Sequence, residues 1–467
     1  MADAIGGSRP LRVAVVGSGP SGFYAAEALI KEAAMKVEVD ILDRLPMPFG
    51  LVRGGVAPDH QKIKSVIKVY EKTAADPRVR FFGNIKLGTD LGVDDLRRCY
   101  DAVIYAVGAE SDNRMGIPGE ELKGSHPATE FVGWYNGHPD YRDSRFELDC
   151  ESVAVVGIGN VAMDVTRILA EDPEELAKTD MAAHAVAALR KSRVRDIWLL
   201  GRRGTAQAAY SPAEIQEIGG LASADLVVRP EDAVLDEASK EDYDKADASV
   251  KKNVEYLQTV APRGEGTRAR KVRLRLCVSP VELIGENGAV ASVRIEKNVL
   301  MRDEKGAVRP KGTGRFETIK IGMILRSVGY FGIAIPGVPF DTKKGVIPND
   351  KGRVLQAPGG AGLSGEYVVG WAKRGPSGLI GTNRACSYET AAAVLEDFRG
   401  KPLPSAPERT AQAAESFLRA RRADLVTFAD WKRLDQLEVE RGKAAGKIRE
   451  KFSSIPEAMA ALKPVKA

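Results

Sequence analysis

Residues 11–22 read LRVAVVGSGPSG, an apolar run followed directly by a glycine-rich turn. A helical pattern over residues 23–34 comes next, and a second apolar run, residues 37–42, ends at Asp43. Strand, glycine turn, helix and strand in this order predict a parallel βαβ unit that binds a dinucleotide. A glycine turn that binds nothing is the competing interpretation, and the complete order of elements disfavours it.

The turn and the acid after the second strand have distinct physical roles in this interpretation. The glycines allow a tight turn, close approach of the backbone to a pyrophosphate, and close packing of helix on strand. The helix N-terminus offers N–H donors and a positive dipole end to the phosphates. Asp43 lies about 20 residues after the glycines, where a carboxylate accepts hydrogen bonds from ribose hydroxyls. This first site suits FAD or NAD, and its predicted contacts are Gly17, Gly19, Pro20, Gly22 and Asp43.

A second unit starts with a strand at 153–156 and a glycine turn at 157–162, and its next strand is 197–200. That strand is followed by Arg202 and Arg203 rather than by an acid. A carboxylate there would repel the 2′-phosphate of NADP, whereas guanidinium groups bind it with paired hydrogen bonds. The alternative for the two arginines is an ordinary solvated basic turn. The second site therefore suits NADP, with predicted contacts at Gly157, Gly159, Arg202 and Arg203.

A third glycine-rich run, residues 370–380, lies between a predicted strand at 367–369 and a predicted helix at 382–395. A helix N-terminus here could stabilise negative charge on a reduced flavin ring, and a plain connecting loop is an equally good interpretation. Largely helical segments are predicted at 172–195 and 230–270. Further strands are predicted at 101–109, at 272–276, 281–284 and 290–295 as an antiparallel meander, and at 323–329 as the return to the first domain.

Composition narrows the class of protein. The 467 residues carry 69 Lys and Arg against 64 Asp and Glu, a net charge of +5, which is too mild for a dedicated nucleic-acid binder. No apolar run approaches the roughly 20 residues that span a bilayer, and the N-terminus has no apolar core typical of a secretion signal. We expect a cytoplasmic enzyme, although a mature mitochondrial chain would look similar.

Four cysteines lie far apart in the sequence, at positions 99, 150, 277 and 386. This spacing excludes a C-x-x-C redox pair and argues against an iron–sulfur cluster held by the chain itself. No metal site is predicted. A basic cluster could receive an acidic protein partner or form a solvated helix end, and its members are Arg190, Lys191, Arg193 and Arg195.

Together these motifs resemble the adrenodoxin reductase family, flavoprotein NADPH:ferredoxin reductases built like glutathione reductase. The stretches that carry the resemblance are PFGLVR at 48–53, VAPDH at 56–60, FVGWYNG at 131–137, GRRG at 201–204 and WAKRGP at 371–376. The resemblance implies an α/β fold with two Rossmann-like domains, the NADP domain inserted into a discontinuous FAD domain. The implied segments are 1–108 (FAD-binding), 109–328 (NADP-binding) and 329–467 (FAD-binding, with a helical C-terminal tail).

The same resemblance implies individual contacts. Ser21 stands where a relative has Ala, and Asp43 where Glu is common, but Asp keeps the ribose-binding carboxylate. The implied FAD contacts are Ser21, Asp43, Leu51, Ile85, Trp371, Gly378, Leu379 and Ile380. The implied NADP contacts are Ile158, Gly159, Asn160, Val161, Arg202, Arg203, Glu214 and Gly378.

Two residues are candidates for handling protons or charge beside the flavin. Glu214 lies in SPAE, residues 211–214, a capping-box sequence in which a purely structural role is the plainer interpretation. His60 follows Asp59 at an apparent helix start, where a surface histidine is the plainer interpretation. In the family that this chain resembles, their counterparts lie near the flavin. Neither is an obligatory acid or base, because hydride transfer to a flavin needs no protein proton donor.

The implied activity passes electrons from NADPH through FAD, singly, to an iron–sulfur ferredoxin. A flavin monooxygenase also has two nucleotide folds, but its F-x-G-x-x-x-H-x-x-x-W linker is not found. A redox sensor that binds NADP(H) and signals by partner binding is a second alternative. Turnover with a one-electron acceptor separates these three functions.

Overall fold

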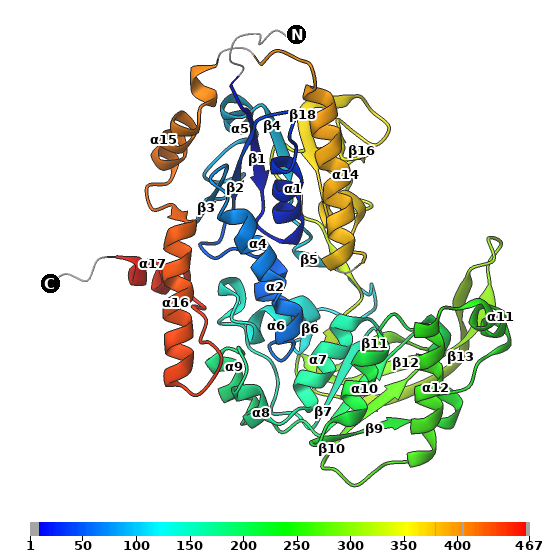
Figure 1. The fold of residues 1–467 in the computed structure, drawn as a ribbon. Coiled ribbons are helices and arrows are strands. Elements are labelled where there is room, and N and C mark those ends of the chain that lie inside the picture. The colour runs from blue at the N-terminus through cyan, green and yellow to red at the C-terminus, as the bar shows by residue number, and fades with distance from the viewer. Residues whose placement is uncertain (1–8, 379, 404–405, 464–467) are drawn as a thin grey trace.

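Two sheets built mainly of parallel strands, one above the other in Figure 1, organise the chain. The computed structural model describes residues 9–378, 380–403 and 406–463. The upper part contains the N-terminal strands and the C-terminal third of the chain, and the lower part contains the middle of the chain (Figure 1). The chain crosses between the two parts twice, and the crossings pair as short antiparallel strands, β5 (Ser111–Asp112) and β15 (Tyr330–Phe331).

The first sheet has eight strands in the order β16-β17-β18-β4-β1-β2-β3-β19. Its five central strands run parallel, and every residue of β1 is buried because both faces of the sheet are covered. Helices α1 and α14 pack together on one face (Figure 1). The strands are β1 (Leu11–Val16), β2 (Val37–Leu42), β3 (Val79–Gly83), β4 (Ala102–Tyr105), β16 (Asn349–Asp350), β17 (Arg353–Leu355), β18 (Gly362–Val368) and β19 (Val426–Thr427).

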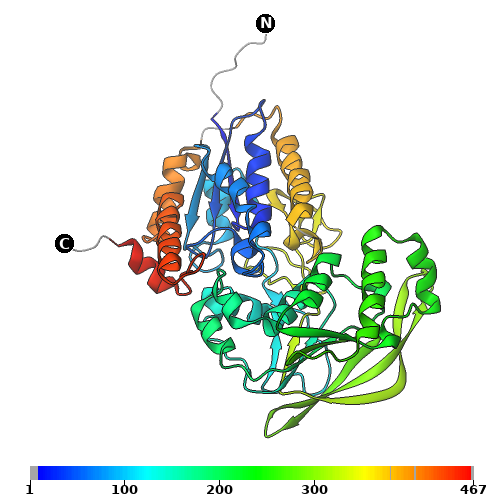
Figure 2. The same ribbon diagram turned by 60° about the horizontal axis from the view of Figure 1, so that its bottom comes forward.

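Helices and the C-terminal tail surround this first sheet. Helix α16 lies beside the upper part in Figures 1 and 2, and the segment after it contacts the lower part, because Lys451 pairs with Asp180 at 3.2 Å. The helices are α1 (Pro20–Ile30), α2 (Gly50–Gly54), α3 (Gln61–Lys64), α4 (Ile67–Ala74), α5 (Val93–Cys99), α13 (Trp371–Arg374), α14 (Ile380–Phe398), α15 (Ala411–Arg421), α16 (Phe428–Ala444) and α17 (Ile455–Leu462).

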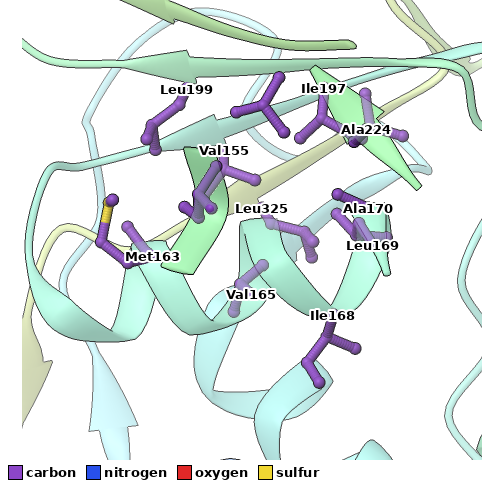
Figure 3. Packing of buried hydrophobic residues seen from close by; sticks show 14 of the residues in the cluster. Val155, Met163, Val165, Ile168, Leu169, Ala170, Ile197, Leu199, Ala224 and Leu325 are labelled. Carbon is purple, nitrogen blue, oxygen red and sulfur yellow. The ribbon is translucent and has the colours of Figure 1, made fainter. Parts of the chain in front are cut away.

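The second sheet has six parallel strands in the order β6-β14-β7-β8-β10-β9. Helix α7 packs on one face, where Met163 lies toward Val155 and Leu199 at one end of the helix and Leu169 lies beside Ala170 at the other (Figure 3). The strands are β6 (Ser125–Pro127), β7 (Ser152–Val156), β8 (Asp196–Leu200), β9 (Ala224–Val228), β10 (Arg270–Arg275) and β14 (Met323–Arg326). The helices are α6 (Ala128–Tyr135), α7 (Asn160–Ala170), α8 (Pro173–Ala177), α9 (Ala183–Leu189), α10 (Pro212–Gly220), α11 (Glu237–Lys245) and α12 (Ala248–Val260).

An antiparallel three-stranded sheet covers the other face of the second sheet. It consists of β11 (Val278–Glu286), β12 (Ala289–Arg302) and β13 (Val308–Lys320). Val293 and Ile319 pack there against Ala154 and Leu200. Figure 2 shows the long β12–β13 ribbon reaching outward from the lower part. Short 3₁₀ turns lie at Pro139–Tyr141, Thr205–Gln207, Pro230–Asp232, Ala261–Arg263 and Pro407–Arg409.

Two strand predictions were wrong in their placement. The run 272–276 was expected in the antiparallel meander, but β10 pairs in parallel with β8 and β9. The run 323–329 was expected to return to the first domain, but β14 lies in the second sheet between β6 and β7. A short apolar run fits any buried strand, so its pattern does not fix which sheet receives it. The predicted helical segment 172–195 is two short helices, α8 and α9, and 230–270 contains α11 and α12.

Within the described residues, none of the helices is both long enough and apolar enough to cross a membrane.

Candidate functional site

The first glycine turn connects β1 to α1 and leaves room for a ligand on one side. Gly17 has φ +111°, and a Cβ there would lie 2.4 Å from the carbonyl oxygen of Ala106. A Cβ on Gly22 would lie 2.0 Å from the carbonyl oxygen of Gly17. By contrast, nothing lies within 4 Å of a Cβ built on Gly19, which caps α1 directly before Pro20. Two glycines are therefore required by the protein backbone, and the third faces open space at the helix N-terminus.

Asp43 follows β2 and also fixes the turn. Its Oδ2 accepts hydrogen bonds from the Ser18 N–H, at 2.8 Å, and from the Ser18 hydroxyl. Its Oδ1 accepts from the Leu45 N–H at 2.9 Å. A carboxylate has about four acceptor positions, so capacity remains for ribose hydroxyls. Sequence reasoning assigned Asp43 only to the ribose, and the structure adds a role in holding the loop.

The C-terminal glycine-rich run meets this first turn. A Cβ on Gly370 would lie 2.2 Å from the Ser21 hydroxyl, so these two segments touch. The next residue, Trp371, buries its indole N–H without a hydrogen-bond partner among the described residues. A buried N–H left unpaired costs about 1–3 kcal/mol. An acceptor atom of a bound ligand would remove this cost, which fits a flavin or its phosphate chain.

The other predicted FAD contacts have contrasting surroundings. Leu51 exposes 39% of its surface although it is apolar, whereas Ile85 is buried. Gly378 has φ +78° just before α14, and Ile380 is the first residue of that helix. Leu379 lies outside the described residues.

The second glycine turn, between β7 and α7, repeats the geometry of the first. Gly157 has φ +126°, and a Cβ there would lie 2.3 Å from the carbonyl oxygen of Ser327. Nothing lies within 4 Å of a Cβ on Gly159, which caps α7. The Asn160 Oδ1 accepts from the Ser211 N–H at 3.0 Å, which ties the turn to the start of α10. This arrangement can also hold a pyrophosphate. The neighbouring Ile158 and Val161 pack against the hydrophobic core under the turn.

Arg202 and Arg203 follow β8 and carry charge that no ion pair within the described part of the chain neutralises. Neither guanidinium forms an ion pair with a carboxylate of the described residues, although the chain pairs many other arginines. The Arg203 side chain is half-buried; burial, and then the charges of Arg202 and Arg309, lower its pKa. Unlike these two, Arg309 is paired with Asp303 at 3.0 Å. Two uncompensated guanidinium groups at the end of this strand suit a phosphate dianion.

A cluster of charged side chains lies where the two parts of the molecule meet. The His60 Nε2 lies 2.9 Å from a Glu217 carboxylate oxygen, and the His60 Nδ1 lies 3.6 Å from Asp164. One polar atom each of His60, Asp164 and Glu214 lies within 4.8 Å of the others. The structure thus brings together His60 and Glu214, which the sequence analysis singled out. The guanidinium of Arg167 already pairs with Asp164 and Glu214.

Glu214 combines a helix-capping position with a perturbed carboxyl group. As the sequence predicted, the Ser211 hydroxyl accepts from the Glu214 N–H, at 3.4 Å, and Pro212 begins the helix. Burial, and next the charge of Asp164, raise the pKa of Glu214 to about 7, although Arg167 opposes this. This carboxyl group therefore exchanges a proton close to neutral pH.

Sequence reasoning missed four members of this cluster: Asp59, Asp164, Arg167 and Glu217. Asp164 and Arg167 are three positions apart on α7, and Glu214 and Glu217 are three positions apart on α10. This spacing places each pair on one helix face, and Asp59 lies in the VAPDH stretch at 56–60; these are the signals that the sequence offered.

The predicted basic cluster is partly neutralised. Arg190 forms two hydrogen bonds of 2.8 Å with Glu174, and Arg193 lies 3.5 Å from Glu151. Both arginines remain exposed. The cluster is therefore less positive than its sequence suggests. All four cysteines lie within the described residues and are free thiols.

Comparisons with known proteins agree with this geometry. Residues 11–189 match the pyridine nucleotide-disulphide oxidoreductase family. NADPH-ferredoxin reductase FprA of Mycobacterium tuberculosis is 43% identical over 457 residues, which cover 96% of this chain and 98% of that protein. The mitochondrial NADPH:adrenodoxin oxidoreductase of Arabidopsis thaliana is 40% identical over 465 residues, or 97% of this chain and 96% of that protein. The solved structure of Mycobacterium tuberculosis FprA in complex with NADPH superposes with a TM-score of 0.92 at 41% identity, covering 97% of this chain and all of that one.

These matches define the class first: the chain has the two-nucleotide α/β fold of the pyridine nucleotide-disulphide oxidoreductases. Within that class, it belongs to the adrenodoxin reductase family, as its motifs predicted. The fold class predicted from the sequence is confirmed.

Proposed function

We propose that this chain is an NADPH:ferredoxin reductase that holds FAD in the first site and NADP in the second. The observation that carries the proposal is the contrast between the two strand ends, because Asp43 suits a ribose and the unpaired Arg202 and Arg203 suit a 2′-phosphate. The names of the relatives, NADPH-ferredoxin reductase and NADPH:adrenodoxin oxidoreductase, support the same reaction.

The sheet topology supports the proposed domain segments 1–108, 109–328 and 329–467. Strand β4 is the last strand of the first sheet before the crossing, and β14 is the last of the second sheet. The paired crossing strands, β5 and β15, begin just after these two boundaries. The NADP-binding segment would then be an insertion between two FAD-binding segments.

When bound, FAD would accept a hydride and release electrons one at a time, and the chain would hold FAD in position. In this proposal the turn from Gly17 to Gly22 receives the pyrophosphate at the N-terminus of α1. Asp43 binds the ribose, and the unpaired Trp371 indole N–H donates to the cofactor. The remaining FAD contacts that we propose from the resemblance are Leu51, Ile85, Gly378, Leu379 and Ile380.

The second turn receives NADP in the same manner. Gly159 leaves space for the pyrophosphate at the N-terminus of α7, and Arg202 and Arg203 bind the 2′-phosphate. His60 and Glu214 lie at the meeting of the two parts, where the two cofactors of such an enzyme must come together. We assign them the control of charge and protons there, not an obligatory acid or base step.

The proposed partner is an acidic iron–sulfur ferredoxin. Docking through Arg190, Lys191 and Arg193 is supported by their exposure, and the ion pairs of Arg190 and Arg193 reduce its strength. We propose a cytoplasmic location, which the bacterial relatives favour, and the mitochondrial relative of Arabidopsis thaliana keeps a mature mitochondrial chain as the alternative.

The decisive experiment is an absorption spectrum of the purified protein before and after anaerobic NADPH. Flavin bands that bleach on addition support both nucleotide sites at once. Rapid reduction of a one-electron acceptor then supports the reductase. Oxygen consumption tied to a hydroxylated product would instead indicate a monooxygenase, and bleaching without turnover would indicate a sensor.

A further inference from the structure

Arg167 is a buried arginine that contacts carboxylates from three segments of the chain. Only 3% of its side chain is exposed. Its Nε and one Nη donate to the two oxygens of Asp59 at 2.8 and 2.9 Å. The same guanidinium donates to Asp164 at 2.9 Å and to Glu214 at 3.3 Å, and it lies 3.6 Å from Glu217. A bidentate arginine–carboxylate pair of this kind fixes the relative orientation of the two side chains and also pairs their charges.

These contacts join the two nucleotide-binding parts. Asp59 lies between α2 and α3, which flank the first sheet. Arg167 lies on α7, and Glu214 lies on α10, which both cover the second sheet. The bidentate Asp59–Arg167 pair therefore crosses the boundary between the parts, directly beside Glu214, which the proposed function places where the two cofactors come together.

We propose that Arg167 is a positioning residue that couples the docking of the two parts to the charge state of Glu214. The inference rests on the proposed function for the location of Glu214 beside the cofactors. It goes beyond that function because it assigns the control of this charge to Arg167, a residue to which the proposed function gives no role. Loosening of the Asp59 contact would direct more of the guanidinium charge toward Glu214.

The charge balance of the cluster makes this control effective. Four carboxylates, Asp59, Asp164, Glu214 and Glu217, face one guanidinium and the imidazole of His60. The phenols of Tyr135 on α6 and Tyr330 on β15 are buried nearby and stay neutral, because burial raises the pKa of both. The acids outnumber the cations, so moving one positive charge changes the proton affinity of Glu214, which has the least exposed side chain of the four acids.

Two substitutions give opposite expectations. Arg167→Gln removes the positive charge, so the pKa of Glu214 should rise further, by about one pH unit or more. Asp59→Asn removes a negative charge and leaves the guanidinium to the remaining acids, so the pKa of Glu214 should fall. A merely structural role would move both variants in the same direction or would leave the pKa unchanged.

The readout is the infrared carboxyl band of the FAD-containing protein, titrated across neutral pH. The Glu214 band is assigned by its loss in Glu214→Gln, and activity is not needed for the measurement. If Arg167→Gln does not fold, Arg167→Lys is used instead, because it loses the bidentate contact but keeps a charge. The pH at which the Glu214 band titrates should still rise in this variant. Lys178→Gln, which breaks an exposed pair with Glu175, is the matched control and should leave the band unchanged.

A higher pKa of Glu214 in Arg167→Gln together with a lower one in Asp59→Asn supports the coupling. Shifts of the same sign, no shift, or a parent protein without a Glu214 band near neutral pH would overturn it. Failure of the proposed function is a separate result, because it would appear as a lack of flavin bleaching by NADPH while the carboxyl titration still proceeds.

Discussion

Arg202 and Arg203 should distinguish NADPH from NADH, because the two coenzymes differ by the phosphate that these guanidinium groups would bind. Replacing both by Gln removes charge-assisted hydrogen bonds worth roughly 1.5–3 kcal/mol each, so NADPH affinity should fall about 10-fold or more per arginine. NADH never makes these bonds and should be affected little. Steady-state kinetics should show a large rise in KM for NADPH, a near-constant KM for NADH and a modest fall in kcat.

The matched control for this prediction is Arg309→Gln. Arg309 lies near Arg203 but is neutralised by Asp303, so its loss should change NADPH binding much less. A double variant that keeps the parental preference for NADPH would contradict the assignment of the second site. Equal losses for both coenzymes would contradict it as well.

Glu214 should make the stability of the fold depend on pH in an unusual direction. Its pKa rises from an ordinary 4.5 in the unfolded chain to about 7 in the folded one. Between these values the folded state binds more protons, so stability falls as pH rises through this window. Glu214→Gln lacks this proton, and its melting temperature should fall less than that of the parent between about pH 5 and pH 8. If the melting temperatures of both proteins change with pH by the same amount, Glu214 titrates like an ordinary glutamate.

At the scale of elements, the two glycines that begin the second turn should respond differently to the same added methyl group. Gly157→Ala places a Cβ 2.3 Å from the Ser327 carbonyl at φ +126°, so the melting temperature should drop markedly. Gly159→Ala has open space and an extended backbone with φ −105°, so the fold should be unaffected. The methyl group would instead occupy the ligand's space and raise the KM for NADPH. Equal effects of both substitutions on melting would remove Gly159 from the nucleotide site.

The elements that the sequence predicted best are those with a complete local signal. β1–α1–β2 and β7–α7–β8 each combine apolar runs with a glycine turn, so their fold and the position of the glycine turn at the helix N-terminus follow from short stretches. The placement of β10 and β14 could not follow, because pairing partners are chosen by long-range packing. The charged cluster around Arg167 could not be predicted from the sequence for the same reason. Nothing in the sequence pairs Asp59 with Arg167, 108 positions apart, and only the fold brings them to 2.8 Å.

At the scale of the whole molecule, the C-terminal tail helps to hold the two parts together. Lys64 on α3 and Lys451, between α16 and α17, both pair with Asp180, between α8 and α9, at 2.7 and 3.2 Å. All three side chains are nearly fully buried. Lys451 also donates to the Asn136 carbonyl oxygen at 3.1 Å. Burial alone would raise the pKa of Asp180, but the charges of Lys451 and Lys64 lower it to about 2.

One carboxylate shared by two buried ammonium groups makes the loss of Asp180 far more damaging than the loss of one lysine. Burial lowers the pKa of both lysines, and of Lys451 most strongly, so both depend on the carboxylate to keep their protons. Asp180→Asn leaves the two buried amines without this carboxylate and should cost about 3–5 kcal/mol of stability. Lys451→Met leaves a one-to-one pair between Lys64 and Asp180 and relieves the repulsion between the lysines, so its cost should be clearly smaller. Thermal unfolding at neutral pH compares the two variants, and limited proteolysis reports whether the tail detaches first. Equal destabilisation would mean that Lys451 acts by packing and by its bond to Asn136, and not as a second cation on Asp180.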